Sequence, residues 1–346
     1  MKLGKLLSVV IPSHNGRYLL EDCLASVHAA AARLPAGSVE ILVVDDASSD
    51  STFEWLTRRW REVKCVRLFE NGGFAAAANA GIAQARGEWV ALLNNDTTVD
   101  ALWIISVVRH FGEAKTACVA SRVLEHGTGI TESAGDGYTI AGLAYQGGNG
   151  ERFDGGGQAF RTFSACAAAA FYRKSALDEV GPFEERLESY YEDVDLGFRL
   201  NLGGFRTLCE PASICHHRRG SSYGSASWKK LKNSARNSET VFFSCMPRSL
   251  LFKSLPAHLA ATLAQGVWRA ANGGLLPFLA GKIAFLFDLP WVLARRRRIQ
   301  SRVHEPGGLA GVVEPDWFSI HIAKRLRLLR RGGSGLKTGP ASQIAR

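Results

Sequence analysis

The stretch W-V-A-L-L-N-N-D, residues 89–96, decides the fold that this sequence predicts. Val90 to Leu93 is an apolar run that is too short for a helix and long enough for a buried strand. It ends abruptly in three small polar residues, Asn94, Asn95 and Asp96. Because ligands of open α/β sheets bind at the carboxyl ends of the strands, a carboxylate there suits Mg²⁺ or Mn²⁺. A turn built from common turn-forming residues is the alternative.

Strands and helices alternate around this stretch. Apolar, β-branched runs predict strands, and apolar residues at helical spacing predict helices between them. The expected strands are 6–11, 39–44, 65–69 and 90–93, and the expected helices begin near residues 18, 51 and 74. Pro12 ends the first strand in this prediction, because proline cannot donate to a sheet ladder. The alternation indicates βαβ units, and therefore an α/β fold with a mostly parallel sheet flanked by helices.

Three of the predicted strands end in polar loops, at Ser13 to Asn15, at Asp45-Asp46 and at Asn94 to Asp96. In a right-handed βαβ arrangement these loops lie at one edge of the sheet. The Gly72-Gly73 pair has neither the G-x-G-x-x-G spacing nor the Walker pattern. The sequence therefore favours a nucleotide that is held through a metal ion and a few carboxylates.

Charge divides the chain into two parts. Residues 1–247 hold 26 Lys/Arg against 28 Asp/Glu, whereas residues 248–346 hold 16 against 4. This predicts a near-neutral body at 1–247 and a basic helical extension at 248–331, with a disordered tail at 332–346. Seven scattered cysteines have no metal or disulfide spacing and indicate reduced, mostly buried thiols of a cytosolic protein. The chain has no signal-peptide pattern.

Six segments carry a family resemblance, and they occur in a fixed order along residues 6–225. They are S-V-V-I-P-S-H-N from Ser8, V-V-D-D-A-S-S-D from Val43, N-G-G-F-A-A-A-A-N-A-G from Asn71, L-L-N-N-D-T from Leu92, Y-Y-E-D-V-D-L from Tyr190 and H-H-R-R-G-S-S from His216. Together they resemble the inverting family-two glycosyltransferases of the GT-A fold, in particular the rhamnosyl- and galactofuranosyltransferase-like branch. The resemblance implies a Rossmann-like donor half at about 1–115 and an acceptor half at about 116–247.

The resemblance also implies a donor site and a metal site. The implied donor-binding residues are Pro12, Ser13, Asn15, Asp45, Asp46, Asn79, Asn94 and Asn95. Asp96 is the implied ligand of Mg²⁺ or Mn²⁺, and Asn94 stands where the family's D-x-D motif has its first acid. His216 is the implied third group near the metal and the diphosphate, with His217 as the second choice. The basic loop that follows, Arg218 to Ser221, is suited to close over a diphosphate.

Three acids open a predicted helix after residue 188. Inversion at an anomeric carbon needs a carboxylate opposite the leaving diphosphate, to accept the proton of the acceptor hydroxyl. Glu192, Asp193 and Asp195 cannot all point into one cleft, because neighbours on a helix face different ways. The matched motif assigns the base to Asp193 and a supporting role to Glu192. The alternative for each acid, favoured for Asp195, is interaction with the helix dipole.

Two segments of the basic extension favour a membrane surface. Leu275 to Ala294 is apolar but carries Lys282, Asp288 and two prolines, which argues against a spanning helix. Trp317 to Arg331 interleaves apolar and basic residues, as helices on anionic membranes do. We therefore expect a peripheral protein at the inner face of a bacterial plasma membrane. A helical cap on the catalytic body is the alternative, and no motif supports nucleic-acid binding.

The sequence thus predicts a metal-dependent inverting glycosyltransferase. It would move a sugar from a UDP- or dTDP-linked donor, with rhamnose as a plausible sugar, to a cell-surface glycan or lipid-linked glycan. A nucleotidyltransferase that makes the activated sugar is the first alternative, but His14-Asn15-Gly16 does not supply the basic glycine-rich loop that it needs. A non-catalytic glycan-binding or membrane scaffold is the second, and it would not require Asp96 and Asp193.

Overall fold

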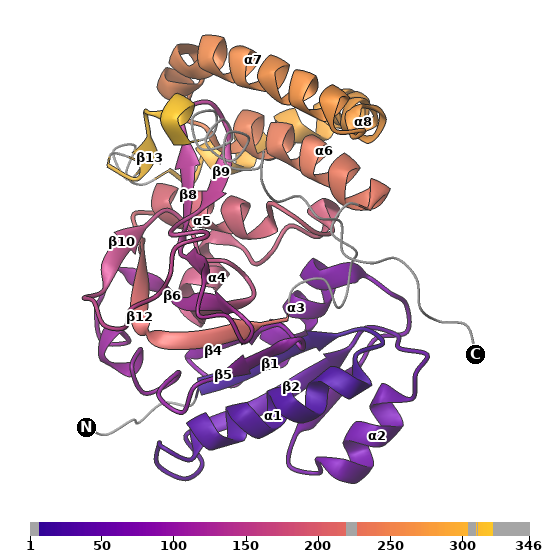
Figure 1. Cartoon of the computed structure of the whole chain (residues 1–346), viewed down its shortest axis with the longest axis vertical. Coiled ribbons are helices and arrows are strands. Elements are labelled where there is room, and N and C mark those ends of the chain that lie inside the picture. The colour runs from indigo at the N-terminus through magenta and orange to yellow at the C-terminus, as the bar shows by residue number, and fades with distance from the viewer. Residues whose placement is uncertain (1–6, 219–226, 304–308, 310, 321–346) are drawn as a thin grey trace.

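The computed structural model describes residues 7–218, 227–303, 309 and 311–320, and these form a central mixed sheet with helices on both faces (Figure 1). The main path of the sheet runs in the order β10-β12-β6-β11-β4-β1-β2-β3. Its strands are β1 (Leu7–Ser13), β2 (Val39–Asp45), β3 (Lys64–Arg67), β4 (Trp89–Leu93), β6 (Thr116–Glu125), β10 (Phe160–Thr162), β11 (Ala169–Arg173) and β12 (Arg206–His217). Two short strands, β5 (Thr97–Val99) and β7 (Thr131–Ala134), pair with β12 and β6.

The N-terminal half of the sheet is parallel, as the alternation of strands and helices predicts. β1 pairs in parallel with β2 and β4, and β2 pairs in parallel with β3. β11 then lies antiparallel between β4 and β6, so the second half of the sheet is mixed. The α/β fold predicted from the sequence is confirmed, and the polar ends of β1, β2 and β4 share one edge.

Pro12 lies inside β1 rather than after it, which corrects the predicted end of that strand. Its partner in the register is Val44 of β2. On the other side of β1, pairing with β4 already stops at Val10. Because β1 no longer pairs with β4 at Pro12, the missing N–H of Pro12 costs no hydrogen bond there, and the strand continues to Ser13.

Two apolar cores sandwich the sheet. On one face α1 (Arg17–Ala31) and α2 (Thr52–Arg59) pack against the sheet together with Trp103. On the other face the packing elements are α3 (Gly73–Gln84), α4 (Lys174–Val180) and α5 (Glu192–Leu202). Gly81 lets α3 approach closely, because a Cβ there would lie 2.2 Å from Val10. All seven cysteines are free thiols, five of them buried.

The glycine-rich stretch between residues 127 and 157 contains ordered strands. It contains β8 (Asp136–Thr139) and β9 (Ala144–Gln146), which form a small sheet with β13 (Val313–Glu314). β8 also meets the segment before β11 through a bridge between Asp136 and Ser164. This sheet therefore brings Asp136 toward the start of α5, which becomes important at the site.

Three helices form the end of the molecule opposite α1 and α2 (Figure 1). They are α6 (Trp228–Cys245), α7 (Arg248–Ala271) and α8 (Leu275–Gln300). α8 packs along α6, and a Cβ on Gly281 would lie 2.4 Å from the carbonyl oxygen of Lys232. The short helix η2 (Glu185–Leu187) precedes α5. The predicted basic helix beyond Ile320 and the predicted tail 332–346 lie outside the described residues.

Candidate active site

The loops that follow β1 and β2 are joined by short hydrogen bonds. His14 Nδ1 lies 2.7 Å from the carbonyl oxygen of Asp46, and the backbone N–H of Asn15 donates to Ser48 Oγ at 2.9 Å. In return the Asn15 amide oxygen accepts from the backbone N–H of Ser49 at 2.8 Å. Asn15 holds the left-handed conformation, with φ of 50°, that this turn requires. The two polar strand ends thus form one continuous rim.

Asp45 and Asp46 have different surroundings although they are adjacent. Asp46 accepts from the backbone N–H groups of Gly72 and Gly73 at 2.8 and 3.0 Å, so its carboxylate holds the start of α3. Asp45 is fully buried and accepts from the N–H of Ser48 at 3.1 Å. Its Oδ2 has no hydrogen-bond partner in the described part of the chain, although Arg67 Nε lies 3.8 Å away. A buried carboxylate oxygen with no hydrogen bond can accept one from a ligand.

Asn79 does not reach this rim with its side chain. Its amide nitrogen donates to the carbonyl oxygen of Phe183 and to Glu185 Oε1, both at 2.9 Å. Its amide oxygen accepts from the N–H of Phe183 at 3.0 Å. Asn79 therefore holds the loop after α4, beside a cavity of about 690 Å³ that Arg295 and Ile299 also line. None of the residues predicted to bind metal or to act as base lines that cavity.

The carboxyl end of β4 brings Asn95 and Asp96 together with β12. Asn95 Nδ2 donates to Ser13 Oγ at 2.9 Å, which ties β4 to the end of β1. Asp96 is buried, and its Oδ1 lies 3.2 Å from His217 Nε2. His217 Nδ1 lies 2.8 Å from Glu132 Oε2 of β7. Asn94, by contrast, contributes its backbone here, donating its N–H to Ala168 at 3.0 Å.

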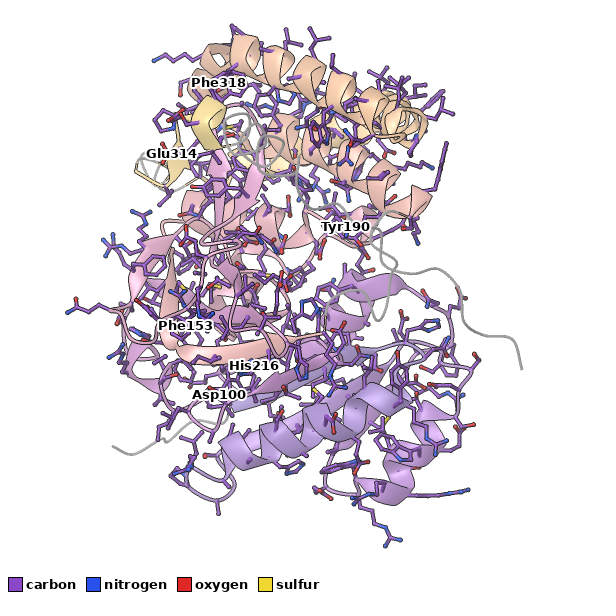
Figure 2. All side chains as sticks on the ribbon, in the orientation of Figure 1. Asp100, Phe153, Tyr190, His216, Glu314 and Phe318 are labelled. Carbon is purple, nitrogen blue, oxygen red and sulfur yellow. The ribbon has the colours of Figure 1, made fainter. Side chains whose placement is uncertain are left out.

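His217, and not His216, is the histidine at Asp96, which corrects the choice made from the sequence. His216 Nε2 lies 3.0 Å from Asp100 Oδ1 instead (Figure 2). Neighbouring residues of a strand point to opposite faces of the sheet, so only one of the two histidines can face Asp96. Glu132, which completes the group, comes from the glycine-rich stretch, and no motif in the sequence singles it out. Of the predicted basic loop, Arg219 to Ser221 lie outside the described residues.

We expect the metal-free protein to lose stability as the pH rises from about 6.5 to about 9. Burial alone lowers the pKa of His217, but its hydrogen bonds to Asp96 and Glu132 outweigh burial and raise that pKa to about 9. A raised folded-state pKa stabilises the fold fully below the unfolded value of about 6.5, and this contribution disappears above about 9.

Thermal unfolding in a chelator across that range measures this loss. His217→Gln should flatten the dependence, whereas the matched variant His216→Gln should keep it. An unchanged slope in His217→Gln would contradict the assignment.

The start of α5 presents the three predicted acids in three different environments. Asp195 is fully buried and ion-paired with Arg199 at 2.9 Å and with Arg295 of α8 at 2.6 Å. Burial raises the pKa of Asp195, but the two guanidinium groups outweigh it and hold that pKa below its ordinary value. Glu192 is also buried, and its Oε2 has no hydrogen-bond partner among the described residues. The two ion pairs of Asp195 indicate that this acid stabilises the fold and is not the base.

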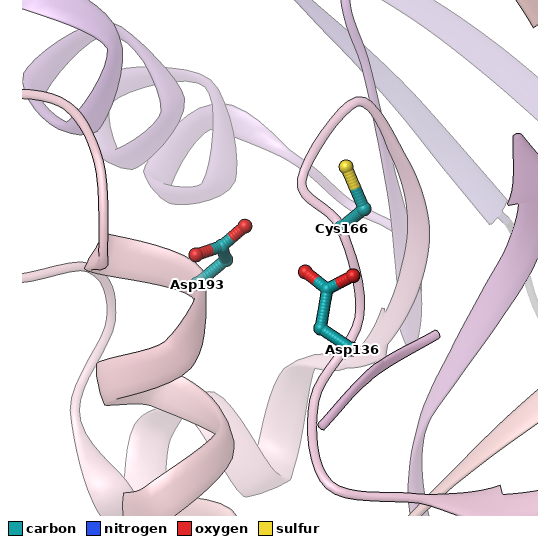
Figure 3. Close-up of side chains that lie close together, drawn as sticks. All are labelled: Asp136, Cys166 and Asp193. Atoms are coloured by element: carbon teal, nitrogen blue, oxygen red, sulfur yellow. The ribbon is translucent and has the colours of Figure 1, made fainter. Parts of the chain in front are cut away.

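Asp193 is half-buried and faces a second carboxylate, Asp136 of β8, with Cys166 beside them (Figure 3). One ligand atom from each of the three lies within 4.8 Å of the others. Burial raises the pKa of Asp193. The hydrogen bond from the N–H of Val194 to Asp193 Oδ1, at 2.8 Å, lowers it, but burial has the larger effect. Burial, followed by the charge of Asp193, raises the pKa of Asp136 well above its ordinary value. With its pKa raised, Asp193 is a stronger proton acceptor than an exposed aspartate.

A strained segment positions α5. Glu188, Tyr190 and Tyr191 all have positive φ, at 59°, 73° and 72°, which side chains with a Cβ rarely adopt. The buried amide of Asn237, from α6, donates to three carbonyl oxygens of this segment. These are Leu187 O at 2.8 Å, Ser189 O at 3.2 Å and Tyr190 O at 2.7 Å. Sequence reasoning missed Asn237, because nothing in its own segment marks it.

Comparison with known proteins shows the family of this chain. The family described as "Glycosyl transferase family 2" matches residues 8–181. The chain is 27% identical over 226 residues to the O-antigen biosynthesis protein RfbC of Myxococcus xanthus, which covers 62% of this chain and 17% of that protein. It is 28% identical over 213 residues to the pre-mycofactocin glycosyltransferase of Mycobacterium tuberculosis, and this match covers 61% of this chain and 42% of that protein. The matched part thus spans less than half of each relative.

Two solved structures share the fold at low sequence identity. GalNAc-T7 with UDP, GalNAc and Mn²⁺ has a TM-score of 0.59 at 15% identity and covers 94% of this chain and 57% of that one. TarS 1-349 of S. aureus with UDP-GlcNAc has a TM-score of 0.54 at 18% identity, and the match covers 86% of this chain and 88% of that one. The family match shows that this chain belongs to glycosyl transferase family 2, and the solved neighbours show that it has the GT-A fold.

Proposed function

We propose that this chain is a metal-dependent, inverting glycosyltransferase that uses a nucleoside-diphosphate sugar. The observation that carries the proposal is the group formed by Asp96, His217 and Glu132 at the carboxyl end of β4, where ligands of such sheets bind. The solved neighbours with UDP, GalNAc and Mn²⁺ and with UDP-GlcNAc support a donor and a metal of this class. The buried Asp45 Oδ2 suits a hydrogen bond from the nucleobase.

The donor set suits Mg²⁺ or Mn²⁺. Asp96 would supply a carboxylate oxygen and His217 a ring nitrogen, with Glu132 orienting the imidazole through its other nitrogen. Mn²⁺ accepts this mixture of oxygen and imidazole more readily than Mg²⁺. The metal, when bound, neutralises charge that develops on the leaving diphosphate. The chain's own residues bind the donor and hold the proton acceptor.

Asp193 is the proposed base. It would accept the proton of the acceptor hydroxyl as that oxygen attacks the anomeric carbon and the diphosphate leaves from the opposite face. Its raised pKa and its place at the start of α5 support this role. Glu192, which is buried beside it, would support the base or bind the acceptor.

The acceptor and the site of action belong to the same proposal. We assign a cell-surface or lipid-linked glycan acceptor, because O-antigen biosynthesis protein RfbC and the S. aureus poly-beta-1,6-N-acetyl-D-glucosamine synthase are among the relatives. The rhamnosyl- and galactofuranosyltransferase-like branch, and a UDP- or dTDP-linked rhamnose-like donor, remain proposals from the sequence motifs. The basic extension supports a peripheral location at the inner face of a bacterial plasma membrane.

A panel of nucleotide sugars tests the function directly. Donor hydrolysis and protection against thermal unfolding are measured with and without Mn²⁺ or Mg²⁺ for each nucleotide sugar. We expect one nucleotide class to be hydrolysed and to raise the melting temperature only when the metal is present. Equal protection by every nucleotide, or hydrolysis that a chelator leaves unchanged, would contradict the proposal. Formation of a nucleotide sugar from a nucleoside triphosphate would favour a nucleotidyltransferase instead.

We expect Asn237→Leu to lower turnover roughly tenfold while donor affinity stays unchanged, because small displacements of a catalytic group are costly. The substitution removes the amide N–H groups that donate hydrogen bonds to three carbonyl oxygens of the segment before Asp193. Steady-state turnover and calorimetric donor binding measure the two quantities. The matched control is Asn233→Leu, one turn earlier in α6, whose amide donates to the Glu188 side chain at 3.4 Å. Equal effects of both variants would refute a positioning role for Asn237.

A further inference from the structure

The outward sides of α7 and α8 are apolar. Large side chains point away from the body along both helices, and we call this set the outer face. It consists of Phe252, Leu259, Leu263 and Val267 on α7 and of Leu276, Leu279, Ile283, Leu286, Phe287 and Leu293 on α8. Leu263 is 72% exposed and Phe287 is 82% exposed. Large apolar side chains that gather on the exposed side of neighbouring helices mark an interaction site more often than single exposed ones do.

The helical period explains why these residues share one side. On α7 they are spaced by seven, four and four positions, which places them opposite the buried Ser254, His258 and Ala261. On α8 they lie opposite Gly281 and Phe285, which pack toward α6. A helix on the surface of a soluble domain normally turns its polar side outward. Both helices reverse this pattern.

Charge is confined to the ends of the outer face. Beyond Lys253 on α7, and before Arg297 on α8, the exposed positions hold no charged side chain. Arg248 and Lys253 stand exposed at the start of α7, and Arg297 and Arg298 stand exposed at the end of α8. Residues 248–303 contain nine Lys/Arg and a single acid, Asp288. Apolar surface bordered by cations complements an anionic bilayer, where apolar groups enter the acyl region and cations meet phosphates.

α8 is 26 residues long and contains an 18-residue window with a mean hydropathy of 1.5, which meets the length and composition of a membrane span. Its inner side nevertheless belongs to the protein. Lys282 is ion-paired with the buried Glu239 of α6, and Arg295 is ion-paired with the buried Asp195 of α5. Extracting α8 into a spanning position would leave the buried Glu239 and Asp195 without these partners. It would also place Lys282 and Asp288 in the hydrocarbon core, and both changes are unfavourable. α8 therefore stays on the body and offers only its outer side.

We propose that the outer face inserts into one leaflet of an anionic bilayer, with α7 and α8 lying in the plane of the membrane. The proposal goes beyond the proposed catalytic function and does not depend on the residues assigned to donor, metal or base. It also differs from attachment by charge alone, because burial of the apolar side chains contributes at any salt concentration. α7, which the sequence analysis did not single out, supplies part of the surface.

Flotation of the full chain with vesicles tests the inference. The probes are vesicles of phosphatidylcholine alone and of phosphatidylcholine mixed with phosphatidylglycerol. We expect strong flotation with the mixed vesicles, weaker flotation with the neutral ones, and partial resistance to high salt. The double variant Leu263→Glu/Phe287→Glu should partition at least roughly tenfold less, because two charges would enter the acyl region. The matched control is Tyr18→Glu, an exposed aromatic on α1 at the opposite end of the molecule (Figure 1).

Three results would overturn the inference. Unchanged flotation of the double variant would show that the outer face does not contact lipid. Flotation that high salt abolishes completely would show attachment by charge without insertion. Absence of flotation would indicate that the outer face binds another protein instead of lipid. Light scattering then separates two cases. A dimer that the double variant disrupts would show that the partner is a second copy of this chain, and a monomer would indicate a different protein.

Discussion

Asp193→Asn should reduce turnover by roughly 100-fold or more while donor binding persists, because it removes the proposed proton acceptor. The half-buried carboxylate already has a raised pKa, so its ionised form is a better base than an exposed aspartate. If Asp193 only interacted with the helix dipole, the same substitution would cost about 1 kcal/mol of stability or less and leave turnover nearly intact. Turnover, donor titration and thermal unfolding of one preparation separate these two cases.

Two further variants make this experiment specific. Asp136→Asn removes the second carboxylate that faces Asp193 (Figure 3), and it should retain far more turnover than Asp193→Asn. Asp178→Asn removes an exposed carboxylate of α4 and serves as the control for a change in charge. The opposite order, with Asp136→Asn inactive and Asp193→Asn active, would assign the base to Asp136. In the wild type, turnover should fall as the pH drops through the raised pKa of Asp193, because protonation removes the base.

Asp96→Ala should abolish metal-dependent donor binding. Substitution of groups that only orient a metal ligand typically costs 10- to 100-fold in affinity, so loss of the ligand itself should cost at least about 100-fold. Calorimetric titration of the donor with Mn²⁺, and again with a chelator, measures the effect. The variant in Mn²⁺ should resemble the wild type in chelator.

Asp100→Ala is the matched control for Asp96→Ala. Asp100 stands beside His216 in the same way that Asp96 stands beside His217, at 3.0 and 3.2 Å respectively. Its removal should leave metal-dependent binding at the wild-type level. Equal losses in both variants would point to a general disturbance around β12, and donor affinity that neither Asp96→Ala nor chelator changes would refute the metal assignment.

The strands at the donor edge could be predicted from the sequence, because each carries its own local signal. An apolar run that stops at a polar residue marks both the strand and its exposed end, as at Asp45 and at Asn94 to Asp96. The right-handed connection of βαβ units then brings those ends together without any further information. The six motifs added the family, and the matched α5 segment added Asp193 as a candidate base.

The tertiary structure alone decided which side chains meet. His216 and His217 are adjacent in β12, and the choice between them depends on register, because successive residues of a strand face opposite sides. Glu132, Asp136 and Asn237 come from segments far from Asp96 and Asp193 in the chain, and no local pattern predicts such distant contacts. The outer face of α7 is likewise invisible in the sequence, since an apolar stripe predicts a buried side until the packing of the helix is known. Sequence periodicity fixes which residues share a side, whereas packing decides whether that side meets the core, solvent or another surface.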